Sequence, residues 1–564
     1  MRRGSVSSRE PRAAKMASGR SRQRQRPLTM DTKPAESSYS TKKEARRAGF
    51  FSAYWLRLLA ISAAVIAPCL WHEHIEAGDL PSHVYNAWLA HLIRTGQAPG
   101  LYIARQWNNI LFDVSLEWVA RVVGLPAAER IVTSLAVLIF FWGAFAVVCA
   151  MARRASRKNV PWFVLPALAM FAYGYTFEMG FMNYYVSIGL AFFALALVLR
   201  ATRIANQDGS PWNWLGVLLL TPLIWLAHPL GMVLLIGGGA YILLADRLPP
   251  RLQVLLFAAS ALLILAVRIY IAGHYVIAWR AGPRLVEDGT DQLLIYGPHY
   301  RLPAYALQFF FWGALLWDII ARLSAASGGV PETHEDTGEA AAAGADNQPR
   351  WWSVYLLPLQ LYGLALLAAW LLPSVVRVPQ YAAPAGLLTE RLTSVSAVLI
   401  CCLLGVMRPR KWHLAGLAAI AAVFFFFLYQ DTGALNRMED QAAHYVRLIP
   451  PGQRVLETIF RFPGSRIFID HMVDRACIQQ CFSYENYEPS SLQFRVRVRS
   501  ENPMVMSSAE NADAAQGGTY ILQPKDLPAF QIYQCDLTMT RLCMRELAVG
   551  EENGRVGLHF RNAR

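Results

Sequence analysis

Hydrophobic residues fall in long runs along most of the chain, separated by short polar stretches. Apolar runs of the length that crosses a bilayer, about 17 to 25 residues, predict eleven membrane spans, near 51–71, 131–151, 160–176, 184–200, 213–226, 230–245, 252–272, 303–321, 351–374, 392–407 and 414–430. The 33 residues 213–245 suit either one long helix or two short helices folded back at His228-Pro229. A content of 55% hydrophobic and 16% charged residues over 564 positions also indicates a membrane protein.

Lys and Arg are unevenly distributed between the predicted loops. With a cytosolic N-terminus and two helices in 213–245, the short inner loops carry 11 Lys/Arg and the short outer loops carry 5. A single helix there would reverse the later loops and spoil this positive-inside bias. We therefore expect the hairpin, a cytosolic N-terminus and an outer C-terminus.

The formal net charge of +14 is concentrated in a tail. Residues 1–50 hold 14 Lys/Arg against 4 Asp/Glu, are rich in Ser, Arg and Gln, and lack apolar periodicity. Such a segment cannot bury enough surface to fold, so we expect a disordered cytosolic leader. A nucleic-acid arm or an anionic-lipid patch is the alternative, and we expect no nucleic-acid partner. Residues 323–350, acidic and rich in Ala and Gly, predict a disordered inner linker.

Two outer regions, 72–130 and 431–564, are too long to be plain connections. In the first, two apolar stripes at helical spacing predict helices lying along the membrane surface, with Trp at headgroup depth. The stripes are Val84, Ala87, Trp88, His91 and Leu92, then Leu111, Val114, Trp118 and Val122.

Residues 431–564 have a different pattern of hydrophobic and polar residues. Short runs rich in β-branched and aromatic residues, separated by Pro, Gly and Asn, predict strands of a small soluble α+β domain. The runs are "QRVLETIF", "SRIFIDHM", "LQFRVRVRS", "GTYILQ" and "FQIYQC".

Four of the eight cysteines lie in this outer region: Cys477, Cys481, Cys535 and Cys543. In an oxidising compartment they predict two disulfides, with three pairings open. Zinc is the alternative, but the spacings lack the usual C-x₂-C pairs.

A polar cluster, "HEHIEAGDLPSHVYNAWLAHLIRTG" at 72–96, follows the first span directly. An acidic residue just outside the first span, in a long helical outer loop, resembles the GT-C superfamily of integral membrane glycosyltransferases, including RgtA/B/C/D-like and protein mannosyltransferase-like members. The resemblance covers 51–430. The family's catalytic carboxylate matches Asp79 in "EAGDLPSHVYNAW", with Glu76 as the substitute, although "GDLPSH" lacks the carboxylate doublet of many members.

The resemblance implies an inverting enzyme of a bacterial inner (plasma) membrane, with a periplasmic C-terminal domain. It would move a sugar from a polyprenyl-phosphate-linked donor, held by membrane lipid, to an unidentified acceptor hydroxyl, with Asp79 as general base. Separately from the resemblance, His83 lies one turn beyond Asp79 and is a candidate either to orient that carboxylate or to bind phosphate. Cations must stabilise the leaving phosphate. The candidates are Arg268, Arg280, Arg284, His299, Arg301, Arg377 and Arg391.

These residues also have other readings. Arg268 lies near a span end, where a side chain snorkels, and the arginines of 280–301 suit charge balance with Glu287, Asp288 and Asp291. Three residues in outer turns face the same side as Asp79 and are candidate substrate contacts: Glu178, Asn183 and His228.

A metal site is a separate hypothesis. His72, His74 and His83 with Asp79 have spacings that suit a divalent metal. Hydrogen bonding at a wet interface is the alternative, and no cofactor is firmly expected.

Other function classes stay open. A multi-pass transporter or flippase of lipid-linked or small polar substrates would also place charges near the membrane, but it usually shows repeated helix sets, which this sequence lacks. A membrane scaffold with an outer interaction module is a third reading. No P-loop, dinucleotide turn or Gly-x-Ser-x-Gly elbow is present.

Overall fold

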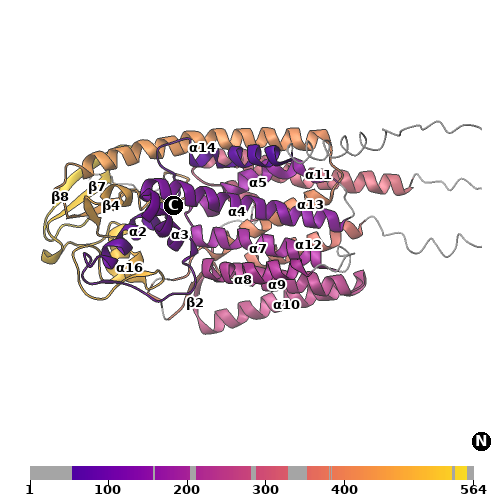
Figure 1. Cartoon of the computed structure of the whole chain (residues 1–564), viewed down its shortest axis with the longest axis horizontal. Coiled ribbons are helices and arrows are strands. Elements are labelled where there is room, and N and C mark those ends of the chain that lie inside the picture. Colours follow the sequence, from indigo (N-terminus) through magenta and orange to yellow (C-terminus); the bar gives the residue numbers. More distant parts are fainter. Residues whose placement is uncertain are drawn as a thin grey trace, which may run out of the picture. The chain divides into compact units, whose positions relative to one another are not determined.

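A computed structural model describes residues 54–155, 159–202, 211–280, 287–327, 352–379, 381–382, 384–460, 462–536 and 540–554 (Figure 1). The chain divides into two units, Met1–Ile61 and Ser62–Arg564. All contacts discussed below lie within the second unit. The predictions made for residues 1–50, for 328–350 and for Arg284 lie outside the described residues.

Eight helices of the described part are long and apolar enough to cross a bilayer. They identify a polytopic helical membrane protein. They are α4 (Leu125–Arg154), α7 (Met182–Ala201), α9 (Pro229–Arg247), α10 (Pro250–His274), α11 (Arg301–Ser327), α12 (Ser353–Leu371), α13 (Leu388–Val406) and α14 (Lys411–Val446).

The other three predicted spans are shorter. Tyr54–Cys69, which ends in the 3₁₀ turn η1 (Ala67–Cys69), and α8 (Trp212–Ala227) are apolar helices of 10 to 17 residues. The region 160–176, predicted as one span, forms no single helix. Gly174 has extended backbone that divides it. The eight-residue α5, about 12 Å long, directly continues η2. The pieces are η2 (Trp162–Val164), α5 (Leu165–Ala172) and α6 (Tyr175–Glu178).

The stretch 213–245 forms two helices, as predicted. His228 has extended backbone between α8 and α9. Along α7, Leu197 packs on Gly216 of α8, whereas the Ser187 hydroxyl donates to the carbonyls of Ile224 and His228. On α9, Gly238 packs on Leu195. Thus α8 runs antiparallel to α7 and α9 runs parallel to it, which is a hairpin.

The C-terminal segment contains a four-stranded mixed sheet in the order β5-β4-β7-β8. The first three strands are parallel, and β8 is antiparallel to β7. Helix α17 (Ala509–Gln516) shares a core with this sheet that includes Leu456 and Ala529. The strands are β4 (Gln453–Thr458), β5 (Cys481–Ser483), β7 (Ala529–Gln534) and β8 (Leu542–Leu547).

Some of the predicted strands are present in the structure and others are not. "QRVLETIF" contains β4 and "FQIYQC" contains β7, but "SRIFIDHM" forms no strand, because the Arg466 N–H donates to the carbonyl of Ile295 in another loop. "LQFRVRVRS" gives only β6 (Val496–Val498), antiparallel to β1 (Leu101–Ile103). "GTYILQ" contributes one isolated bridge at Ile521. The region after the first span therefore pairs directly with the C-terminal segment.

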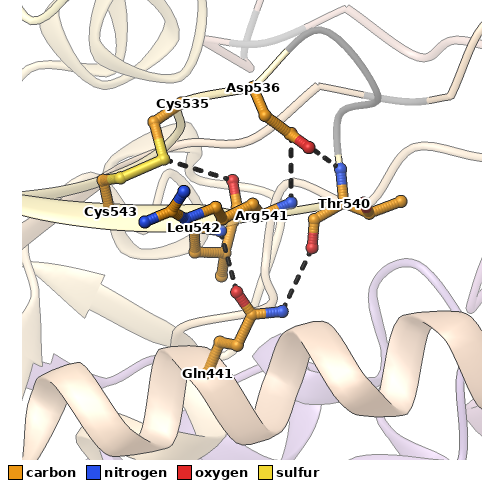
Figure 2. The surroundings of a disulfide bond; sticks show 7 residues. All are labelled: Gln441, Cys535, Asp536, Thr540, Arg541, Leu542 and Cys543. Atoms are coloured by element: carbon orange, nitrogen blue, oxygen red, sulfur yellow. Dashed lines mark hydrogen bonds between the residues drawn. A yellow bond between two sulfur atoms is a disulfide. The ribbon is translucent and has the colours of Figure 1, made fainter.

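Helix α14 joins the bundle to the sheet. Its 36 residues span about 54 Å and pass the predicted boundary at 430/431 without a break, reaching the strands in Figure 1. Near its end, the Gln441 amide donates to the Thr540 carbonyl and accepts from the Leu542 N–H (Figure 2). This clamp lies beside the Cys535–Cys543 disulfide; the other disulfide is Cys477–Cys481.

Helix α2 (Leu80–Arg94) differs from the predicted surface helix. Val84, Ala87 and Trp88 are buried rather than exposed to lipid, because the C-terminal segment covers them. Trp88 stacks on Phe482. Helix α3 (Leu111–Val123) keeps its apolar face open, with Trp118 62% exposed.

Short elements complete the unit. Strands β2 (Val276–Ala278) and β3 (Val375–Arg377) pair antiparallel. The remaining turns are η4 (Thr290–Leu293), η5 (Pro298–Tyr300), α15 (Asp474–Cys477), α16 (Glu488–Ser491) and η7 (Pro524–Asp526).

One buried cation ties these parts together. The Arg475 guanidinium donates to Glu129 of α4 at 2.7 Å, pairs with Glu439 of α14 and donates to the carbonyl of Ile75. The three carboxylates of Glu76, Glu129 and Glu439 all act to raise the pKa of Arg475, more than offsetting its burial. Arg475 thus fixes the C-terminal segment to two membrane-length helices and to the segment before Asp79.

Replacing Arg475 with Met should leave these carboxylates without their cation. Breaking a buried charge pair in this way costs about 3–5 kcal/mol. We expect a large fall in the thermal unfolding temperature of the detergent-purified protein. Arg301→Met, at an exposed position, is the matched control, and equal unfolding temperatures for the two variants would contradict the role given to Arg475.

Candidate functional site

Asp79 stands at the start of α2, where its backbone is held against the turn before α7. The N–H of Gly78 donates to the carbonyl of Glu178, and that of Asp79 to Met179. The turn needs glycine at position 180: φ is +77°, and a Cβ would lie 2.4 Å from the Asp79 nitrogen. The Asp79 side chain caps no N–H of the helix and is partly exposed. Its backbone is therefore fixed while its carboxylate stays available.

Three cationic side chains act on this carboxylate. Burial raises the pKa of Asp79, and His471, His83 and Arg391 oppose the rise. Burial alone would lower the pKa of His83, but Asp113, Glu488 and Asp79 raise it to about 9. Likewise Asp474, Asp79 and Glu457 overcome burial and raise the pKa of His471 to about 10. Both imidazoles are therefore protonated at neutral pH beside Asp79.

Asp113 and Asn183 hold His83 in place. The His83 Nδ1 lies 2.7 Å from Asp113 Oδ1, and the Asn183 amide donates to Asp113 Oδ2 at 2.7 Å. The other amide atom of Asn183 accepts from the Phe112 N–H. Burial acts to raise the pKa of Asp113, but His83 and Asn183 bring it below its ordinary value. The predicted residues His83 and Asn183 thus meet through Asp113, a lone carboxylate in an apolar stretch that sequence reasoning missed.

Arg391 presents its guanidinium to the same end of the bundle. It lies over the ring of Phe181, 4.2 Å from the centroid, and 5.9 Å from that of Tyr184. Its Nε is buried without a hydrogen-bond partner. Within the described part of the chain, no carboxylate forms an ion pair with it. This leaves a cation near Asp79 that lacks an anion.

His228 completes this end of the bundle. Its Nδ1 accepts from the Leu230 N–H, and its ring lies 5.5 Å from that of Tyr184. Burial, aided by the charge of Arg391, lowers the pKa of His228 to about 3. The imidazole is neutral, and because Nδ1 accepts, Nε2 carries the proton and can donate one hydrogen bond.

The C-terminal segment adds two groups that the sequence did not indicate, His471 and Glu488. Glu488 Oε1 accepts from the Ser82 hydroxyl at 2.8 Å. Burial raises the pKa of Glu488 to about 7, with His83 acting against it. Because these residues follow Asp79 by about 400 positions, only the folded chain brings them to it.

Glu76 and Glu178 belong to a different, buried environment. Glu76 accepts from the Asn436 amide at 2.8 Å, and Glu178 accepts from the Tyr296 hydroxyl at 2.6 Å. Burial raises the pKa of each well above its ordinary value. Each of the two carboxylates accepts a hydrogen bond from a residue that packs the loops.

Most of the predicted phosphate-binding set is engaged elsewhere. Arg280 pairs with Glu287 and Glu390, at 3.3 and 3.5 Å. His299 pairs with Asp431 at 2.8 Å. Arg268 lies over the ring of Trp279, and Arg301 and Arg377 are exposed. Among the described members of the set, Arg391 is the one whose charge acts on Asp79.

The residues predicted for a metal site are not brought together. His72 stacks on Tyr429 and its Nε2 lies 3.0 Å from that residue's carbonyl, while His74 pairs with Glu439. Over the described ranges, no three His, Cys, Asp or Glu side chains are arranged to hold a metal ion. The His72, His74, His83 and Asp79 set therefore does not fit one.

No protein-family model, curated protein or solved structure matches this chain. The function must therefore be argued from the site. An accessible carboxylate among cations, beside an unpaired guanidinium and a neutral imidazole, can accept a proton and bind an anion together.

The raised pKa of Glu488 makes stability depend on pH. The folded-state pKa of Glu488, near 7, exceeds its value in the unfolded chain. Between these two values the folded protein keeps a proton that the unfolded chain loses. The contribution of Glu488 to the free energy of unfolding therefore falls as pH rises from about 4.5 to 7. Glu488→Gln should therefore stabilise the protein at pH 8.5 by about 3 kcal/mol and have little effect near pH 4.5.

Thermal unfolding of wild type and Glu488→Gln at the two pH values measures this difference. Glu73→Gln, at an exposed carboxylate elsewhere in the chain, is the control and should show none. An equal gain at both pH values would contradict the assignment.

Proposed function

We propose that the protein is a GT-C-type membrane glycosyltransferase. It transfers a sugar from a polyprenyl-phosphate-linked donor to an acceptor hydroxyl, inverting the anomeric centre, with Asp79 as the general base. The observation that carries the proposal is the electrostatic interaction between Asp79 and Arg391, which lie at the same end of the bundle. No carboxylate of the described residues forms an ion pair with the Arg391 guanidinium.

Asp79 and Arg391 suit the two charges that move in the reaction, which are the proton of the acceptor and the negative charge on the leaving phosphate. As the acceptor oxygen attacks the anomeric carbon, its proton passes to Asp79 and the bond from carbon to the phosphate oxygen breaks. The departing phosphate gains negative charge, which Arg391 stabilises. Protonated His83 and His471 favour the ionised form of Asp79 against the effect of burial, so that it is ready to accept the proton.

The location of the site suits a donor that stays in the membrane. Asp79, the turn at Gly180 and the break at His228 lie at one end of the bundle. The other end holds Arg154, which donates to Thr202 and Asp246. The Lys/Arg bias assigns the Asp79 end to the outer, periplasmic side with the C-terminal segment, and leaves the N-terminus cytosolic. No nucleotide sugar is needed there, because a lipid phosphate can serve as the leaving group.

Asp79→Asn tests the base. The amide has nearly the same shape but cannot take the proton, so transfer from a polyprenyl-phosphate sugar should fall by at least about 10²-fold with folding intact. Activity is measured with purified protein in lipid nanodiscs, and Glu73→Gln is the matched carboxylate-to-amide control. Wild-type rates in Asp79→Asn would remove Asp79 as the base.

Arg391→Gln tests the phosphate contact. Transfer, measured as kcat/KM for the donor, should fall by about 10²-fold or more, while Arg377→Gln, which changes an exposed arginine, should leave it unchanged. If neither the Asp79 nor the Arg391 variant alters transfer of any sugar, the transporter or flippase hypothesis replaces the enzyme.

A further inference from the structure

Three arginines converge on one carboxylate near the far end of α2. Glu117 of α3 is buried, pairs with Arg94 of α2 and accepts from Arg121 of its own helix at 2.9 Å. Arg495, from the C-terminal segment, pairs with the same carboxylate. Three cations meet this one carboxylate, and Asp113 is a further anion that acts on Arg495, so positive charge is still in excess.

This excess is not relieved within the cluster. The pKa of Arg94 is lowered by burial and then by the neighbouring charges of Arg495 and Arg121, which is the sign of mutual repulsion. The Nε of Arg495 is buried without a hydrogen-bond partner. A further anion at this point would therefore be stabilised by charge and by hydrogen bonds.

The cluster borders a large cavity. A space of about 830 Å³ lies between α2, α3, the start of α4 and the C-terminal segment, and both Glu117 and Arg121 line it. This size is typical of sites for small organic ligands. Its walls are mainly apolar, with Val84 and Trp88 on one side and Leu125 and Pro126 on the other. Glu129 and Arg475 also reach it but are already paired with each other.

The position of the cavity favours a lipid over a soluble anion. It lies at the corner where α3 ends and the membrane-length helix α4 begins. Beside it, Trp118 and Val122 are 62% and 84% exposed, and the Arg121 guanidinium lies over the Trp118 ring. Exposed Trp and aliphatic residues with arginine at the end of a span are typical of the headgroup layer.

We propose that this cavity binds an anionic phospholipid. Its phosphate contacts Arg121, which lines the cavity beside Glu117, and its acyl chain lies along the wall formed by Trp88 and Leu125. The site is separate from the one around Asp79, because Ser82 and Asn86 are on the Asp79 side of α2 whereas Val84 and Trp88 are on the other. It does not depend on the proposed transferase activity.

Native mass spectrometry of the delipidated full-length protein in detergent tests the proposal. Phosphatidylglycerol, phosphatidylcholine with the same acyl chains, and inorganic phosphate are titrated separately. We expect tight binding of phosphatidylglycerol, and at least 10-fold weaker binding to Arg121→Gln and to the cavity-filling variant Ala120→Trp. Arg301→Gln, an exposed arginine elsewhere, should bind as wild type does.

Three outcomes would overturn the proposal. Equal affinity for phosphatidylglycerol and phosphatidylcholine would remove the charge recognition. Unchanged binding to both cavity variants would place the lipid elsewhere. Competition by inorganic phosphate as strong as that by phosphatidylglycerol would identify a soluble-anion site.

Discussion

A buried guanidinium must be paired, and the pairing of Arg475 determines how the parts of this protein meet. Its partners come from α4, from α14 and from the segment after the first apolar helix. The desolvation of such a cation is compensated only when all these carboxylates and the Ile75 carbonyl are in position. The bundle and the C-terminal segment are therefore constrained together, and Gly78 and Asp79, close to Ile75 in the chain, are placed by the same contacts.

Because of this constraint, the buried carboxylates differ in the partners that they bind. Glu76, Glu129 and Glu439 surround Arg475, Glu178 accepts from Tyr296, and Asp113 is paired with His83. Asp79 alone among these six has a carboxylate to which no side chain of the described residues donates a hydrogen bond. The other five carboxylates serve the structure, and the cations around Asp79 oppose the rise in its pKa that burial causes.

Local signals predicted much of this arrangement. The break at His228-Pro229 and the strands β4 and β7 could be read from the sequence, since a proline after a polar residue and a β-branched run act locally. The failures depend on distant contacts: "SRIFIDHM" bonds to the loop at Ile295, and the stripe on α2 is covered by the C-terminal segment. Sequence reasoning also predicted seven candidate cations for binding the phosphate and could not distinguish among them. The contacts that distinguish them form only on folding.

Within the proposed function, ion pairing distinguishes Arg391 from Arg280. Both come from segments at the Asp79 end, and both were candidates for the phosphate, yet Arg280 is held by two carboxylates while Arg391 rests on two aromatic rings. An aromatic face stabilises a guanidinium by only about 0.5–2 kcal/mol and forms no ion pair with it. A carboxylate would compete with the phosphate for the guanidinium N–H groups. Aromatic support therefore keeps Arg391 oriented without neutralising it, which is the state that a phosphate-binding cation requires before its ligand arrives.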